Sequence, residues 1–385
     1  MSEKVERIRN IALIGHGGAG KTSLAEALLY KSGTIKRFGK VEEGNTAMDF
    51  EPEELKRRSS ISSGFHQLSW KNHTVNLIDT PGDQNFFSDT KSSMQAADGA
   101  VVVIDAVDGV KVQTELAWEF AKGFNQPCMI FINKLDRERA DFNRTFEDAK
   151  VSFEPKPIIL QLPIGAETEF KGVVDLVRNQ AYVYDADGNS KKEDIPAEMQ
   201  ELVESEREAL IENIAEADDA LIERYLEGEE LSVEDLNAAL RSGTLSNTFV
   251  PVVCGSATQN IGIDLLMDFV TTSMPSPIDR GVRTGVDYST GDEIERAPDE
   301  NAPFSALVVK TVADAYAGRL SIFRVVSGKL GSDGTFFNPN KDTKERFTQL
   351  LTIAGKEQKT ATEAGPGSIV AVAKLKETRT GDTLC

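Results

Sequence analysis

The sequence predicts an α/β domain with an inserted α+β subdomain, followed by a small antiparallel β-barrel domain. Apolar strand-like runs alternate with amphipathic helical runs in the first half, and a long acidic stretch interrupts them before the last strand. Beyond this domain, glycines separate short apolar runs, which is typical of an all-β domain. We therefore expect a first domain at 1–280 with an insert at 157–246, a linker at 281–301 and a barrel at 302–385.

The strands of the first domain are predicted from near-continuous apolar runs at residues 11–14, 100–105, 127–133 and 249–255. Such runs suit strands that are buried on both faces of a mostly parallel sheet, whose ligand lies at the carboxyl ends of the strands. Residues 68–70 and 74–78 flank a short turn and predict an antiparallel pair.

Helices are predicted at residues 21–32, with Gly33 as a C-cap, and at 112–124. In the second helix, Val112, Leu116 and Phe120 share one face. Barrel strands are expected at residues 304–310, 320–326, 335–338, 347–354 and 368–375.

The insert is expected to hold strands at 158–161 and 181–184, an acidic helical run at 197–227 and a short helix opened by a capping box at Ser232 and Asp235. The segment Asp185-Ala186-Asp187-Gly188-Asn189 predicts a hairpin turn, because its spacing does not match an EF-hand. We interpret the acidic helices as a solvated face, with a docking surface as the alternative.

Composition and charge exclude several classes of protein. Hydrophobic residues make up 40% and charged residues 27% of the chain, which indicates a globular protein. An apolar run long enough to span a membrane and the apolar core of a signal peptide are both missing, so we expect a cytoplasmic protein without a membrane partner. The net charge of −19 argues against binding DNA by overall attraction, so any nucleic-acid contact needs a local basic face.

The cysteines and histidines of the sequence indicate neither a disulfide nor a zinc site. Cys128 and Cys254 lie in apolar runs and are expected to be buried, reduced thiols. The three histidines form no HExxH pattern, and no CxxC is present, so no zinc site is expected.

A phosphate-binding loop is predicted at Gly15-His16-Gly17-Gly18-Ala19-Gly20-Lys21-Thr22. This segment fits G-x-x-x-x-G-K-[ST] in full and lies between a predicted strand and a predicted helix, which is the context that the motif requires. Its backbone amides would surround the phosphates, Lys21 would reach the β- and γ-phosphates, and the Thr22 hydroxyl would bind Mg²⁺.

A second loop follows the next strand at Asp79-Thr80-Pro81-Gly82. Asp79 could hold a water on Mg²⁺, and the Gly82 amide could contact the γ-phosphate. The position of this turn, downstream of a phosphate-binding loop, makes it a specific signal.

Base selection is predicted at Asn133-Lys134-Leu135-Asp136, directly after an apolar strand. The Asp136 carboxylate can accept two N–H bonds from guanine, which adenine cannot offer, and the Lys134 stem can pack over the base. After the last strand, Gly255-Ser256-Ala257 is placed to donate a backbone amide to guanine O6. The three motifs together predict an α/β P-loop GTPase domain that binds GTP or GDP with Mg²⁺.

At this point the chain resembles the translational GTPases, and among them the elongation factor G family. The resemblance covers essentially the whole chain. It rests on Ala47-Met48-Asp49-Phe50, on the motifs at Asp79 and Asn133, on Asp98-Gly99-Ala100-Val101-Val102-Val103, on residues 161–167 and 171–176 of the insert, and on residues 303–308 and 318–325 of the barrel.

This resemblance implies a monomeric cytoplasmic GTPase of protein synthesis that binds the ribosome, including its rRNA and its ribosomal proteins such as the stalk. The family normally carries three further C-terminal domains, to which nothing in this sequence corresponds, so we expect a truncated chain. The resemblance leaves three roles open: ribosomal translocation, a GTP-dependent ribosome-binding regulator without efficient turnover, and a ribosomal protection protein.

Four departures from the family pattern concern catalysis. The family has R-G-I-T-I where this chain has Arg57-Arg58-Ser59-Ser60-Ile61, so Arg58 replaces a glycine and Ser60 replaces the threonine that senses Mg²⁺ and the γ-phosphate. Gly18 replaces a P-loop aspartate, and Asp83 replaces the histidine that orients the attacking water.

A carboxylate beside the γ-phosphate meets like charge, although it could accept a proton. The candidate catalytic residues are therefore Lys21, Gly82 and Asp83. Our hypothesis is that hydrolysis is slow or depends on groups that the ribosome supplies.

Overall fold

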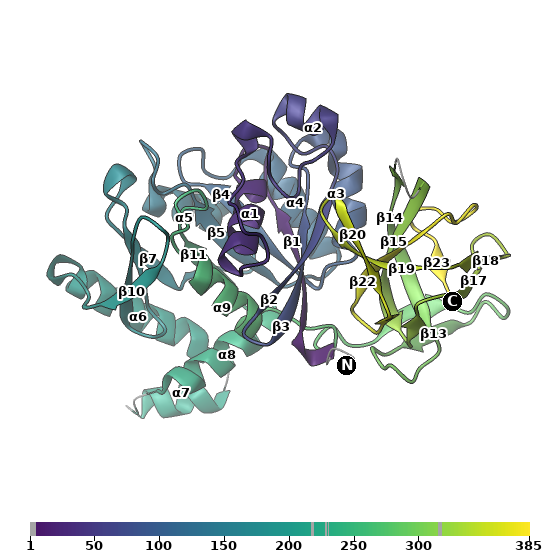
Figure 1. Ribbon diagram of the computed structural model, residues 1–385. Coiled ribbons are helices and arrows are strands. Elements are labelled where there is room, and N and C mark those ends of the chain that lie inside the picture. The colour runs from purple at the N-terminus through teal and green to yellow at the C-terminus, as the bar shows by residue number, and fades with distance from the viewer. Residues whose placement is uncertain (1–4, 217–218, 228, 230, 315–317) are drawn as a thin grey trace.

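The computed structural model describes residues 5–216, 219–227, 229, 231–314 and 318–385. A central α/β region lies between the insert on one side and an antiparallel β region on the other (Figure 1). The helices that this structure describes include none that is long and apolar enough to cross a membrane.

The central sheet has seven strands in the order β2-β3-β1-β4-β5-β11-β6. Its strands are β1 (Ile8–Ile14), β2 (Gly64–Trp70), β3 (His73–Asp79), β4 (Gly99–Asp105), β5 (Cys128–Asn133), β6 (Pro157–Ile159) and β11 (Val250–Cys254). Only β2 pairs antiparallel, with β3, and every other pair in this sheet is parallel. The sheet confirms the predicted α/β class, and β1, β4, β5 and β11 are buried at every position, as their apolar runs indicated.

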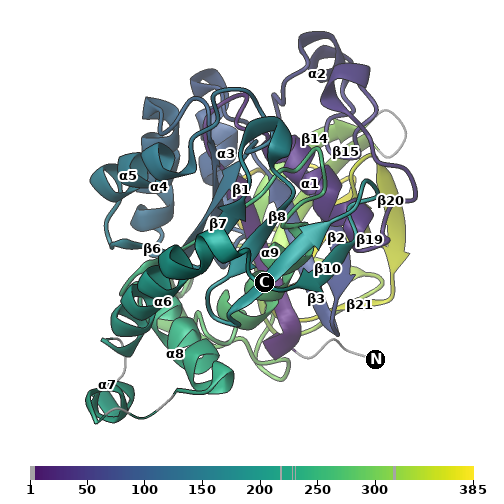
Figure 2. The same ribbon diagram turned by 90° about the vertical axis from the view of Figure 1, so that its left-hand side faces the viewer.

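Helices pack on both faces of this sheet (Figure 2). They are α1 (Lys21–Lys31), α3 (Phe87–Met94), α4 (Val112–Gly123), α5 (Phe142–Ser152) and α9 (Ile263–Ser273), and a short α2 (Pro52–Arg57) lies between α1 and β2 in the chain. The predicted helix at 21–32 is confirmed as α1, and Gly33 follows it with φ 74°.

The face of α4 that carries Val112, Leu116 and Phe120 is not its buried face. Val112 is 66% exposed, and Leu116 and Phe120 are only partly buried. The buried face instead carries Thr114, Ala117, Trp118 and Ala121. The inner face therefore combines one large aromatic ring with small side chains, and it is turned away from the face that carries Val112 and Leu116.

The insert forms its own four-stranded sheet in the order β10-β9-β8-β7, with three helices beside it. Its elements are β7 (Gln161–Ile164), β8 (Gly172–Asp175), β9 (Gln180–Tyr184), β10 (Ser190–Glu193), α6 (Gln200–Ala215), α7 (Asp219–Leu226) and α8 (Val233–Leu245). The boundary at residue 157 needs correction, because β6 pairs parallel with β11 in the central sheet.

Two local predictions within the insert are confirmed. The Ser232 hydroxyl accepts the Asp235 amide while Asp235 accepts the Ser232 amide, so the capping box opens α8. Residues 185–189 form the hairpin turn between β9 and β10. The acidic run, however, contains two helices, α6 and α7, rather than one.

The last region is built from antiparallel strands. They are β12 (Arg283–Val286), β13 (Glu293–Arg296), β14 (Ser305–Asp314), β15 (Gly318–Ser327), β16 (Leu330–Gly331), β17 (Gly334–Asn338), β18 (Thr343–Phe347), β19 (Leu350–Ala354), β20 (Glu357–Ala361), β21 (Glu363–Ala364), β22 (Ile369–Ala373) and β23 (Thr383–Leu384). The strand expected at 347–354 is divided between β18 and β19, and the expected linker contains the hairpin β12–β13. The core of this antiparallel region includes the stacked rings of Phe336 and Phe347.

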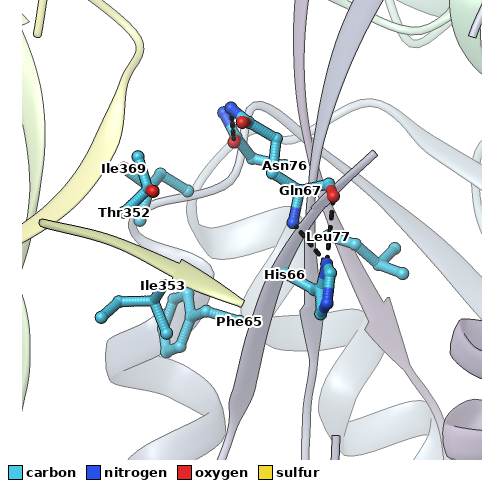
Figure 3. Close-up of a pocket in the computed structure, with 8 residues that line it drawn as sticks. All are labelled: Phe65, His66, Gln67, Asn76, Leu77, Thr352, Ile353 and Ile369. Atoms are coloured by element: carbon cyan, nitrogen blue, oxygen red, sulfur yellow. Dashed lines mark hydrogen bonds between the residues drawn. The ribbon is translucent and has the colours of Figure 1, made fainter. Parts of the chain in front are cut away.

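The barrel packs directly on the edge of the central sheet. The Gly355 amide donates to the Phe65 carbonyl of β2 at 2.8 Å. Figure 3 shows Phe65 of β2 facing Ile353 of β19 at the small cavity between the two sheets. That cavity measures only about 10 Å³, which is close to the smallest space that holds one water molecule. A larger cavity of about 600 Å³ lies at the same contact and is lined from both regions, by residues that include Phe65, Lys310 and Gly355.

Cys128 and Cys254 are buried and free, as predicted, and Cys385 is exposed and free. Burial raises the pKa of the Cys128 thiol to about 12, so this group stays protonated at neutral pH.

Candidate nucleotide-binding site

The loop that follows β1 is shaped to surround an anion. Gly18 and Gly20 adopt φ 88° and 96°, in the left-handed region that favours glycine. The Lys21 ammonium, buried at the start of α1, donates to the carbonyls of Gly15 and His16, at 2.9 Å each. Among the residues that the structure describes, no hydrogen bond uses the amides of Lys21 and Thr22, so both remain available for phosphate oxygens.

The residues predicted to hold Mg²⁺ lie together. The hydroxyls of Thr22 and Ser60 are 3.0 Å apart, although 38 residues separate them in the chain. Asp79 is 1% exposed, and neither of its carboxylate oxygens has a hydrogen-bond partner within the described part of the chain. A buried carboxylate without a partner is costly, and two hydroxyls with a carboxylate form the oxygen-rich set that Mg²⁺ prefers. These residues therefore fit the ion.

Sequence reasoning missed a second buried carboxylate beside this set. Asp49 is 5% exposed, and the Ser60 hydroxyl lies close enough to its carboxylate to lower the pKa of Asp49 in part. Burial raises the pKa of Asp79 to about 7 and that of Asp49 to about 6, and the Asp49 charge adds to the rise at Asp79. Asp49 stood within the motif Ala47-Met48-Asp49-Phe50, but nothing in the spacing indicated that it faces this site.

The segment that leads to Ser60 is strained at Arg58. Arg58 ends α2 with φ 54°, a conformation that favours the glycine found here in the family pattern. The adjacent Glu54 carboxylate accepts the amides of Ile61 and Ser62 at 3.0 and 3.1 Å, which fixes the backbone just beyond Ser60.

Gly82 lies against the phosphate loop, and Asp83 turns away from it into a local cap. The Gly82 carbonyl accepts the Gly17 amide at 3.0 Å, and a Cβ at Gly82 would lie 2.4 Å from the Lys21 ammonium. This position therefore requires glycine. Asp83 is exposed, and its Oδ1 accepts both the amide and the side-chain N–H of Asn85 at 2.9 Å.

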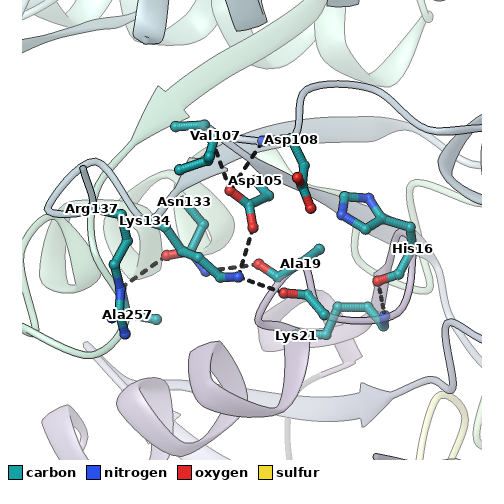
Figure 4. Close-up of polar contacts among 12 residues, drawn as sticks. His16, Ala19, Lys21, Asp105, Val107, Asp108, Asn133, Lys134, Arg137 and Ala257 are labelled. Carbon is teal, nitrogen blue, oxygen red and sulfur yellow. Dashed lines mark hydrogen bonds and ion pairs between the residues drawn. The ribbon is translucent and has the colours of Figure 1, made fainter. Parts of the chain in front are cut away.

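The predicted base-reading residues converge at the ends of β5 and β11 (Figure 4). The Asn133 side chain donates to the Ala19 carbonyl and accepts the Ala257 amide, both at 3.0 Å. Asn133 thus joins the phosphate loop to the loop after β11. Ser256 is fully buried and opens that loop. Because Ala257 already donates to Asn133, guanine O6 would share this amide or use that of Thr258.

Asp136 and Lys134 lie beside this loop. Asp136 Oδ1 is buried and has no hydrogen-bond partner among the described residues, as expected for an acceptor reserved for a ligand. The Lys134 ammonium donates to the Gly18 carbonyl at 2.7 Å and to the Asp105 carboxylate at 2.6 Å. Sequence reasoning missed Asp105, the last residue of β4, which fixes Lys134 over the site.

His16, Asp105 and Asp108 also approach one another, with ligand atoms within 4.8 Å (Figure 4). The His16 Nδ1 atom shares a hydrogen bond with the Thr114 hydroxyl at 2.9 Å, and burial lowers the pKa of His16 to about 4, so the ring is neutral. Lys134 and Lys111 already neutralise the two carboxylates, at 2.6 and 2.7 Å. This group is therefore an internal ion-pair network.

The family comparisons agree with this geometry. The elongation factor Tu GTP binding domain family matches residues 6–276, and the elongation factor G domain 2 family matches residues 303–385. The chain belongs to the translational GTPases of the elongation factor G type.

A solved structure supports the same placement of this elongation factor G-type chain. The crystal structure of a protein from Thermus thermophilus superposes with a TM-score of 0.87 and 32% sequence identity, covering 98% of this chain and 54% of that protein. The chain spans about half the length of that relative. Membership in a GTP binding domain family agrees with a guanine nucleotide as the ligand of this site.

Proposed function

We propose that this elongation factor G-type protein binds Mg²⁺·GTP, hydrolyses it, and acts in GTP-dependent ribosomal translocation during protein synthesis. It would work in the cytoplasm on the ribosome, with rRNA and ribosomal proteins, including the stalk, as its partners. Lys21 and the amides of residues 15–22 would hold the phosphates. Thr22, Ser60 and Asp79 would hold Mg²⁺, and Asn133, Lys134, Asp136, Ser256 and Ala257 would surround the guanine.

The observation that carries the nucleotide assignment is the pair of unsatisfied carboxylates, one at each end of the site. Asp79 lies beside Thr22 and Ser60, and Asp136 lies beside Asn133 and Ala257. Each buried acceptor needs a partner that the described chain does not supply, and a Mg²⁺·guanine nucleotide would satisfy both. Together with family membership, this supports GTP as the ligand.

The same geometry supports slow or ribosome-dependent hydrolysis. Phosphoryl transfer depends mainly on positioning and on stabilising negative charge. At Asp83 the chain offers a further negative charge, and its carboxylate is held by Asn85. The cation that the phosphate loop itself contributes is Lys21, so a group from the ribosome would complete the catalytic set.

Single-turnover GTP cleavage on ribosomes tests this proposal with wild type, Asp83→His and Asp83→Ala. We expect slow cleavage by the wild type, a rate at least about tenfold higher for Asp83→His, and little change for Asp83→Ala, because a single positioned acid–base group is worth about 10²–10⁴-fold. Fast wild-type cleavage that collapses in Asp83→Ala would show instead that Asp83 is catalytic.

A further inference from the structure

We infer that the β9–β10 hairpin of the insert is a positioning element for guanine recognition, holding in place the loop that meets guanine O6. This inference rests on the proposed binding of a guanine nucleotide. We call residues 256–260 the guanine loop. The hairpin lies about 70 residues earlier in the chain, yet it contacts both the guanine loop and the helix that follows it.

The first contact is made by two hydroxyls of the hairpin. Tyr184, at the end of β9, donates to Asp264 Oδ1 at 2.6 Å, and Ser190, at the start of β10, donates to Asp264 Oδ2 at 2.6 Å. Asp264 lies in the first turn of α9, shortly after the guanine loop. Both carboxylate oxygens are therefore held by the insert, and Tyr184 is buried. Hydrogen bonds to an ionised acceptor are the stronger kind.

The second contact is made by the tip of the hairpin. Gly188 adopts φ 76°, and a Cβ at this position would lie 2.5 Å from the Cβ of Asn260. The glycine therefore allows the hairpin backbone to lie directly against the guanine loop. The Gly188 carbonyl also accepts the Lys31 ammonium from the end of α1, which ties the tip to the central domain.

The guanine loop connects the hairpin to the backbone amides that would contact guanine O6. The loop is closed by paired hydrogen bonds between Ser256 and Ile261, at 3.0 and 3.1 Å. Inside it, the Asn260 amide donates to the Ala257 carbonyl at 3.4 Å, and the Ala257 amide donates to Asn133. A shift of Asn260 would therefore move the amides of Ala257 and Thr258, which are the donors available to O6.

The hairpin contacts the base-binding part of the site rather than the phosphate-binding loop. Among the described residues, none of the hydrogen bonds of the hairpin reaches residues 15–22, whose amides would hold the phosphates. Disturbing the hairpin should therefore weaken the contact with O6 more than the phosphate contacts, which lie one step further from the guanine loop, beyond Asn133. If the hairpin only stabilised the fold in general, disturbing it would weaken the contacts with the base and those with the phosphates to the same extent.

The test measures equilibrium binding of GDP and of 6-thio-GDP, each with Mg²⁺, to the full chain. The thio analogue keeps N1–H and the 2-amino group but replaces O6 with a weak acceptor. For Gly188→Ala we expect GDP affinity to fall about fivefold to tenfold, and for Tyr184→Phe about threefold, the size of one hydrogen bond. Affinity for 6-thio-GDP should change by less than about twofold.

Two matched controls separate this effect from general strain. Gly291 has φ 79°, and a Cβ at this position would meet no described atom within 4 Å, so Gly291→Ala introduces the same backbone strain without the contact. Tyr182→Phe removes a hydroxyl from the same strand as Tyr184, but one that takes no part in holding Asp264. Both controls should bind GDP like the wild type.

The outcomes are distinguishable. Wild-type affinity for GDP in both Gly188→Ala and Tyr184→Phe overturns the inference, and so does an equal loss for GDP and 6-thio-GDP. A wild-type chain that binds neither nucleotide overturns the proposed function itself. Selective loss of GDP affinity in the two hairpin variants supports the positioning role.

Discussion

The protonation of Asp79 should make the free energy of unfolding depend on pH and on bound Mg²⁺. Burial, and to a lesser extent the nearby Asp49 carboxylate, raise its pKa from 3.8 to about 7. The folded, metal-free chain therefore keeps a proton on Asp79 that the unfolded chain releases at lower pH. Because the folded state binds the extra proton, the stabilisation is present below about pH 4 and is lost as pH rises to about 7.

We expect this loss to disappear in Asp79→Asn, which has no carboxylate to titrate. Denaturant unfolding in a chelating buffer, at intervals from about pH 4.5 to about pH 7.5, measures the difference in unfolding free energy between the two chains. The wild type should lose stability relative to Asp79→Asn as pH rises, and Mg²⁺·GDP should reverse the trend. A difference that is constant with pH would mean that Asp79 is ionised throughout.

In the proposed function, base specificity depends on Asp136. Its buried Oδ1 is unsatisfied within the described chain, so it can accept the N–H groups of guanine. Asp136→Asn offers an N–H in place of one acceptor, which suits the carbonyl of xanthine. We expect guanine affinity to fall about 10²-fold or more and xanthine affinity to rise, because an unpaired buried polar group is costly.

Competition binding of GDP and XDP to the two chains measures this change, with Glu138→Gln as a nearby surface control. Unchanged preference for guanine in Asp136→Asn would contradict the assignment of this residue.

At the scale of residues, the sequence predicted the groups whose chemistry is local. The phosphate loop, Asp79 and Asn133 each lie at the end of a strand, so their position at one edge of the sheet follows from the strand order alone. Asp49 does not lie at the end of a strand, and Asp105 ends β4 but belongs to no nucleotide-binding motif of the sequence. Their roles depend on contacts with Ser60 and Lys134, which the tertiary fold creates.

At the scale of elements, hydrophobic periodicity predicted most helices and strands, but it did not predict their partners in the fold. In α4 the buried face carries Trp118 with Thr114 and two alanines rather than Val112 and Leu116. In β6 a short strand joins the central sheet, although we expected the insert to begin there. Both errors have the same cause. Hydrophobic pattern indicates that a face is buried, but distance of approach and strand pairing depend on partners elsewhere in the chain.

Strand β14 connects the barrel to the segment that carries Ser60. The Lys310 ammonium, on a side chain that is buried, contacts the Ser62 hydroxyl, the Ser63 carbonyl at 2.9 Å and Asp89 of α3 at 3.0 Å. One amine thus joins the segments on both sides of the predicted Mg²⁺ site.

We expect Lys310→Met to destabilise the chain by about 1–3 kcal/mol, because it leaves a partly buried Asp89 without its cation. Hydrogen exchange at residues 59–63 should become faster, since these amides lose an anchor. Denaturant unfolding and exchange mass spectrometry measure the two effects. The control is Lys356→Met, because Lys356 is exposed and lines the same cavity of about 600 Å³ as Lys310. Equal effects of Lys310→Met and Lys356→Met would contradict the role of Lys310 in connecting β14 to residues 62–63 and to Asp89.

At the scale of the whole molecule, a buried ion pair fixes the barrel to the central domain. Arg324 of β15 contacts Asp98 at 2.6 Å, with side chains 3% and 0% exposed, and donates to the Ala96 carbonyl at 3.0 Å. Asn10 bonds to Asp98 from β1 and also to the Gly367 carbonyl of the barrel. The two regions therefore share one polar network.

Removing one partner of this pair should be costly. We expect Arg324→Met to lower the free energy of unfolding by about 3–5 kcal/mol, because Asp98 keeps a buried charge. The double variant Arg324→Met/Asp98→Asn should recover part of that loss. Denaturant unfolding measures both, with the exposed Arg346→Met as control. If Arg324→Met is no less stable than the control, this network does not hold the two regions together.

The barrel also protects the central sheet from self-association. Strand β2 is an edge strand, and an uncovered edge of this length would offer free backbone groups to the strand of another molecule. The turn at Gly355 covers it by donating to the Phe65 carbonyl, and a Cβ at Gly355 would lie 2.1 Å from the Ala47 carbonyl oxygen. A protein reduced to residues 1–280 would expose this edge, and we expect it to aggregate more readily as its concentration rises.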